Sequence, residues 1–191
     1  MKLRHLYDSV AVADSVRVLR EGVQNSLRQA LLDLVRCLVD VKWALVGGLA
    51  VGYRSRPRGT QDIDIALVSD DVIADVVGAC DSFKQIRKHA LEHLSTGVEV
   101  DLVTPEFVHD RNLGVAIESA VVCDGVPVVT ASALVALKLN RASLQDRADI
   151  EAILKSNEVD LSPFQLTDEQ RLILAQIANE HPHVSPDDSV N

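Results

Sequence analysis

Two aspartates separated by one residue carry the strongest chemical signal in the sequence. Asp62 and Asp64 lie in the stretch D-I-D-I-A-L, which is typical of a β-strand, and alternate residues of a strand point to the same face. Two carboxylates side by side repel each other and lose solvation, so a fold that keeps them needs a compensating cation. Oxygen ligands beside a glycine turn favour Mg²⁺ that is shared with substrate phosphates.

The segments around this strand could complete such a site. Gly47 and Gly48 follow an apolar strand expected at 42–46 and form the predicted turn into a short helix, where bare backbone N–H groups can bind phosphate. A third carboxylate, Asp101, lies in an alternating strand expected at 97–103. If that strand is the neighbour of the Asp62–Asp64 strand, the three carboxylates converge and can hold two Mg²⁺ ions, which stabilise the attacking and leaving oxygens of an in-line displacement.

These motifs in this order resemble the polymerase β-like nucleotidyltransferase superfamily. The resemblance is nearest to its minimal branch of AbiEii-type abortive-infection toxins. It depends on the G-G turn, the R-G-T-Q-D-I-D strand and V-D-L-V, followed by a helical motif with a lysine and two aspartates. That last motif is A-L-K-L-N-R-A-S-L-Q-D-R-A-D-I, with Lys138, Asp146 and Asp149. The resemblance spans residues 42–103 and 126–156.

The resemblance implies a fold, an activity and a set of site residues. The implied fold is α/β, a mixed twisted sheet with flanking helices (the nucleotidyltransferase fold). The implied activity is transfer of a nucleoside monophosphate from a nucleoside triphosphate (NTP) to an acceptor, with release of pyrophosphate. The catalytic metal ligands would be Asp62, Asp64 and Asp101, and the nucleotide-binding residues would be Gly47, Gly48, Arg58, Thr60 and Lys138. The roles of Arg54, Arg56, Asp146 and Asp149 stay open.

The biological role that the resemblance implies is the toxin of a toxin–antitoxin or phage-defence pair, with a cognate antitoxin as partner. The acceptor stays open among RNA, protein and a small molecule. One alternative is a small-molecule nucleotidyltransferase of the aminoglycoside type, because an acidic surface suits a cationic acceptor. Another is a nucleotide-binding or interaction module that has kept the fold without turnover.

Composition limits the class of protein. The 191 residues are 47% hydrophobic and carry 28 acidic against 19 basic side chains, a net charge of −9 that argues against non-specific nucleic-acid binding. No uncharged apolar run reaches the ~18 residues of a membrane span, and no signal-peptide pattern follows Met1. The three cysteines, Cys37, Cys80 and Cys123, lack C-x-x-C spacing and are expected to be reduced thiols of a cytoplasmic protein.

The remaining pattern predicts mainly helices. Residues 1–40 are expected to form a helical cover with a helix over 9–39, residues 41–130 the core, 131–180 the C-terminal helices, and 181–191 a disordered tail. A hairpin is predicted at 121–129, turning at Asp124 and Gly125. Residues 89–93 match the zinc-protease pattern H-x-x-E-H, but Ser95-Thr96-Gly97 would end the helix that such a site needs, so we expect no zinc site there.

Overall fold

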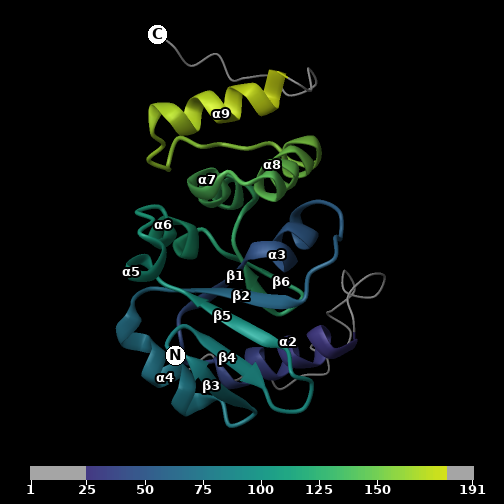
Figure 1. The fold of residues 1–191 in the computed structure, drawn as a ribbon, viewed down its shortest axis with the longest axis vertical. Helices are drawn as coiled ribbons and strands as arrows, with labels where there is room; N and C mark the ends of the chain where they lie inside the picture. Colours follow the sequence, from purple (N-terminus) through teal and green to yellow (C-terminus); the bar gives the residue numbers. More distant parts are fainter. Residues whose placement is uncertain (1–24, 180–191) are drawn as a thin grey trace.

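The structure is a computed structural model that describes residues 25–179, and Figure 1 shows its fold. Within this range seven strands form one mixed sheet in the order β3-β4-β5-β2-β1-β7-β6. The strands are β1 (Trp43–Val46), β2 (Asp62–Leu67), β3 (Phe83–Arg87), β4 (Ala90–His93), β5 (Glu99–Val103), β6 (Val121–Cys123) and β7 (Val126–Val128). β2 pairs in parallel with β5 and antiparallel with β1. The predicted α/β class, a mixed sheet with flanking helices, is confirmed.

Helices cover both faces of the sheet. In Figure 1, α2 (Asn25–Cys37) and α4 (Ile73–Ala79) lie below it, with the 3-10 turn η3 (Asp70–Val72) just before α4. Above it lie α3 (Gly47–Arg54), α5 (Pro105–Val108), α6 (Leu113–Glu118), α7 (Ala131–Arg141) and α8 (Leu144–Ser156). The last helix, α9 (Asp168–Asn179), packs outermost against α7 and α8.

Apolar periodicity determines which faces are buried. Leucines recur every three or four residues along α2 and its end and are almost fully buried against the sheet: Leu27, Leu31, Leu34 and Leu38. All four residues of β1 are buried, as expected for a strand covered on both faces. The structure adds β4 and α6, which the sequence analysis did not predict. The first part of the predicted helix, 9–24, and the predicted tail, 181–191, lie outside the described residues.

The predicted hairpin turn is present, and α8 begins with a capping box. Asp124 and Gly125 both have positive φ, 51° and 78°, as the tight turn between β6 and β7 requires. Ser143 and Asp146 form a reciprocal capping box at the start of α8. These short-range signals succeed because each involves residues within one turn of the chain.

The prediction of three reduced cysteines is wrong for two of them. Cys37, at the end of α2, forms a disulfide with Cys80, which follows α4 directly, and only Cys123 is free. The two helices end close together, with a Cα–Cα distance of 5.2 Å that suits a disulfide. Disulfides are typical of oxidising compartments, so a cytoplasmic location stays a prediction. Between residues 25 and 179, no helix is long and apolar enough to cross a membrane.

Candidate active site

The three predicted metal ligands lie on one face of two adjacent strands. Asp62 and Asp64 alternate with the fully buried Ile63 on β2. β5 runs parallel to β2, and Asp101 is the register partner of Asp64. The structure therefore brings the three carboxylates to one face, as the sequence predicts if the two strands are neighbours.

The environment of this face raises the pKa of two of its three carboxylates. Burial, followed by repulsion from Asp62 and Asp101, raises the pKa of Asp64 to about 6. Burial and the charge of Asp62 also raise the pKa of Asp101, although Arg87 opposes the increase. In both residues burial is the largest cause and a neighbouring carboxylate adds to it, so the ionised forms are disfavoured at this face.

The Gly47–Gly48 turn packs directly on this face. Gly47 has a φ of +63°, and a Cβ atom there would lie 1.8 Å from the Asp64 Oδ2 atom. A Cβ atom on Gly48 would lie 2.8 Å from the Thr60 Oγ1 atom. The Gly48 N–H donates a hydrogen bond to the Asp64 carboxylate, which lowers the pKa of Asp64 in part. One of the two N–H groups expected to meet phosphate is thus directed at Asp64.

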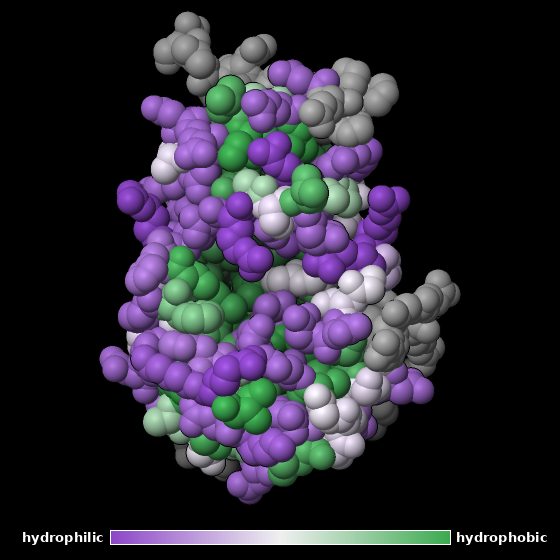
Figure 2. Space-filling model, viewed as in Figure 1, coloured by the Kyte–Doolittle hydropathy of each residue, from purple (hydrophilic) through white to green (hydrophobic). Residues whose placement is uncertain are grey.

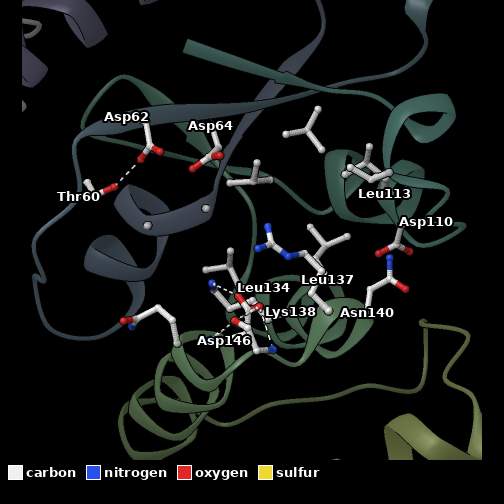
Figure 3. Close-up of a pocket in the computed structure, with 18 of the residues that line it drawn as sticks. Thr60, Asp62, Asp64, Asp110, Leu113, Leu134, Leu137, Lys138, Asn140 and Asp146 are labelled. Carbon is white, nitrogen blue, oxygen red and sulfur yellow. Dashed lines mark hydrogen bonds and ion pairs between the residues drawn. The ribbon is translucent and has the colours of Figure 1, made fainter. Parts of the chain in front are cut away.

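Thr60 supports the neighbouring carboxylate. Its hydroxyl donates a hydrogen bond of 2.7 Å to Asp62 Oδ1, which Figure 3 draws as a dashed line. This bond restricts the rotation of the Asp62 side chain. In this structure Thr60 orients Asp62 at the edge of the site.

An ion network joins Arg58, in the segment before β2, to Lys138 of α7 and Asp149 of α8. The Asp149 side chain, 3% exposed, accepts hydrogen bonds from the Arg58 Nε (2.8 Å) and Nη2 (3.0 Å) atoms and from the Lys138 Nζ atom (2.7 Å). Lys138 also contacts Asp146 at 3.1 Å. Burial raises the pKa of Asp149, but the bonds from Lys138 and Arg58 outweigh it and lower that pKa overall. The two predicted phosphate-binding cations are therefore joined through one carboxylate.

These groups line a cavity of about 470 Å³ between the sheet and the C-terminal helices. Figure 2 shows the hollow at mid-height of the molecule, with hydrophobic side chains along one wall. Its polar end contains Gly47, Gly48, Arg58, Asp62, Asp64 and Lys138, and its other end contains Val108, Asp110, Leu113, Leu137 and Asn140. Asp101, in register beside Asp64, does not line this cavity.

The sequence analysis did not single out Asp110, Leu113, Leu137 or Asn140. Asp110 and Leu113 lie in the segment from α5 to α6, which carries no motif of its own, and α6 itself was not predicted. Leu137 and Asn140 flank Lys138 in the helical motif, but the spacing of that motif draws attention only to charged residues. The face of α7 is the signal that could have identified Leu137 and Asn140, because residues 137, 138, 140 and 141 all line the cavity.

The other two arginines before β2 differ from Arg58. Arg54 donates to the backbone carbonyls of Val128 and Val129, both at 2.7 Å, and so ties α3 to the end of β7. Arg56 is exposed. Arg54 therefore has a structural role in this fold.

The H-x-x-E-H segment lies on and just before a strand rather than on a helix. His93 and Glu92 lie in β4 and His89 just before it, so no helix presents them together. His89 Nε2 lies 2.9 Å from Asp70 Oδ1, and the buried His93 lies 3.2 Å from Asp33. Each histidine has its own structural partner.

Mg²⁺ would have to bind at this site with few protein ligands. Across residues 25–179, no group of three or more His, Cys, Asp or Glu side chains lies close enough to form a ready-made metal cluster. Mg²⁺ commonly takes only one or two carboxylates and completes its shell with water and substrate phosphates. Asp62 and Asp64, two oxygen donors on one face, fit that requirement.

Comparison with known proteins finds similarity among solved structures only. No family model matches the sequence, and no curated protein matches it. The chain is similar to the crystal structure of ANT(2″)-Ia in complex with adenylyl-2″-tobramycin, with a TM-score of 0.49 and 11% sequence identity. The similarity covers 82% of this chain and 99% of that chain. At this identity and TM-score the likeness supports no argument about the function of this chain or about the AbiEii-type branch.

Proposed function

We propose that the protein is a Mg²⁺-dependent nucleotidyltransferase. It transfers a nucleoside monophosphate from an NTP to a hydroxyl of an acceptor and releases pyrophosphate. The observation that supports this most is the placement of Asp62 and Asp64 on one face of β2 with Asp101 in register beside Asp64, under the Gly47–Gly48 turn. Three carboxylates gathered against a glycine turn repel one another and destabilise the fold, and such a cost is typical of a functional site rather than of a purely structural strand pair.

The carboxylates and the bound Mg²⁺ would have different roles in the reaction. Asp62 and Asp64 would hold one Mg²⁺ together with the triphosphate, and Asp101 would add a ligand for a second. Bound Mg²⁺ neutralises the charge that develops on the phosphoryl oxygens. Asp101, in register beside Asp64, could also take the proton of the acceptor hydroxyl, either directly or through the metal.

The remaining residues position the triphosphate. The Gly47 N–H lies at the start of α3, where the helix dipole favours an anion. Lys138 on α7 and Arg58, whose guanidinium lies beside Gly48, supply positive charge. Because Asp149 and Asp146 hold these cations in place, they are preorganised before a nucleotide binds.

For the acceptor, the resemblance to AbiEii-type toxins supports RNA or protein, with a cognate antitoxin holding the activity in check. Expression of the protein alone tests this role. Growth arrest by the wild type, and normal growth with Asp62→Asn/Asp64→Asn, is the expected result. Normal growth with both would favour the small-molecule alternative, which the net charge of −9 suits when the acceptor is cationic.

The decisive assay is Mg²⁺-dependent release of pyrophosphate from each NTP, with and without total RNA. The wild type should release pyrophosphate, and Asp62→Asn/Asp64→Asn should lose at least about 10³-fold in rate, as expected when the charge-stabilising groups of a transition state are removed. Asp75→Asn, an exposed aspartate on α4, is the matched control and should match the wild type. Equal rates for the wild type and the double variant would overturn the proposal.

A further inference from the structure

The cavity has a second end whose chemistry differs from that of the phosphate site. Val108 and Leu113 on one side and Leu137 on the other give it apolar walls, while Asp110 and Asn140 supply polar groups. In Figure 3 the labelled side chains of Asp110 and Asn140 lie near Leu113 and Leu137, away from Asp62. An NTP has the same two-part character, because a charged triphosphate is joined through ribose to a flat base with apolar faces and polar edges.

Asp110 is a buried carboxylate aimed into this end. The residue is 7% exposed and lines the cavity. Its Oδ1 atom accepts a 2.8 Å hydrogen bond from the Asn112 N–H. Within residues 25–179 its other oxygen has no donor, so the side chain keeps acceptor capacity toward the cavity.

The loop that carries Asp110 is held firmly. Asn112, 3% exposed, donates from its side-chain amide to the Gln165 carbonyl at 3.1 Å and accepts from the Gln165 N–H at 2.8 Å. These paired bonds tie the start of α6 to the segment before α9. A group fixed in this way can discriminate between ligands, because the site cannot rearrange to satisfy a poor match.

We infer that this end of the cavity binds the base of the NTP and that Asp110 selects bases that carry an exocyclic amino group. The inference rests on the proposed nucleotidyl transfer. The same cavity is lined by Asp62 and Asp64, so a triphosphate at these aspartates leaves the apolar end for the nucleoside. An ionised carboxylate only accepts hydrogen bonds, which suits an amino group and repels the carbonyl that replaces it in uracil or hypoxanthine. Asn140, whose amide both donates and accepts, can contact the remaining edge of the base.

The test is equilibrium binding of Mg²⁺–nucleotides to the full chain by calorimetry, using ligand pairs that differ at the amino group. These pairs are CTP against UTP, and ATP and GTP against ITP. The tightest nucleotide should carry an amino group, and its partner without that group should bind about tenfold more weakly. This measurement on the wild type needs no variant.

The variant Asp110→Asn provides the second arm. An amide can still accept the Asn112 N–H, so the fold is kept, but it presents a donor as well as an acceptor to the base. It should reduce the difference within each pair to less than about threefold, whereas Asp75→Asn should leave it unchanged. Three results would overturn the inference: equal binding within the pairs for the wild type, a uniform change for all nucleotides in Asp110→Asn, or no change at all. If no nucleotide binds even the wild type, the proposed function fails with it.

Discussion

A Cβ atom on Gly47 would lie 1.8 Å from the Oδ2 atom of Asp64. The turn that ends β1 thus passes so close to the carboxylate that only glycine fits. The same residue has a φ of +63°, a region that other residues enter at a cost. Gly47 is therefore required both by the backbone conformation of the turn and by the close packing of that turn on Asp64.

Gly47→Ala should destabilise the protein by about 2 kcal/mol or more, because the left-handed backbone and the contact with Asp64 both resist a Cβ atom. Urea unfolding measures the loss. Gly78→Ala is the matched control, since Gly78 lies in α4 and a Cβ atom there meets nothing within 4 Å. It should be neutral or stabilising by up to about 1 kcal/mol. Equal stability of the two variants would contradict this reading of Gly47.

Asp64→Asn should stabilise the metal-free protein in a pH-dependent way. The pKa of Asp64 is about 6 in the fold against an ordinary 3.8, so the folded protein binds this proton more tightly than the unfolded chain. Stability therefore falls as the pH rises from about 4 to about 6, by at most about 3 kcal/mol. In EDTA the variant should melt higher than the wild type near pH 7.5 and equally near pH 4. A constant difference across this range would show that the charge of Asp64 is not its cause.

Nucleotide with Mg²⁺ should stabilise the wild type by mass action and leave Asp62→Asn/Asp64→Asn nearly unchanged. Thermal melts of both proteins, in EDTA and in Mg²⁺–NTP, give the four curves needed. Asp75→Asn should shift as the wild type does. Equal shifts in the wild type and the double variant would mean that these aspartates do not hold the metal.

The Lys138–Asp149 pair should couple strongly in folding stability. A double-mutant cycle with Lys138→Met and Asp149→Asn should give about 1–3 kcal/mol, because both side chains are at least nine-tenths buried. The exposed pair Lys84–Glu92 is a matched control, since its N–O distance is also 2.7 Å. Its coupling should be below about 1 kcal/mol. Similar coupling in the two pairs would show that burial of the network adds nothing.

Reduction of the Cys37–Cys80 disulfide should lower the free energy of unfolding by about 2–4 kcal/mol. The bridge joins cysteines 43 residues apart, and its loss removes this constraint from the unfolded chain. Thiol titration in denaturant should find one free thiol before reduction and three after it. Cys80→Ser should melt equally with and without reductant, whereas Cys123→Ser should keep the reductant effect. Three thiols before reduction would show that the bridge does not form.

The sequence alone determined the features that depend on near neighbours in the chain. The period of two along β2 places Asp62 and Asp64 on one face, whatever lies next to the strand. The hairpin turn at Asp124–Gly125 and the capping box of α8 follow in the same way from residues within one turn. In each case the residues involved are close together in the chain, so the local backbone conformation is enough to bring them together.

Tertiary structure decided everything that depends on which segments become neighbours. Asp101 joins the site because β5 pairs in parallel with β2, a strand order that no local pattern states. Arg58 and Asp149 meet across 91 residues, and Asp110 reaches the cavity on a loop that Gln165 holds. Cys37 and Cys80 pair for the same reason, since α2 and α4 end side by side. Apolar periodicity specifies how each element buries its face, but the partner of that face is chosen only when the whole core packs.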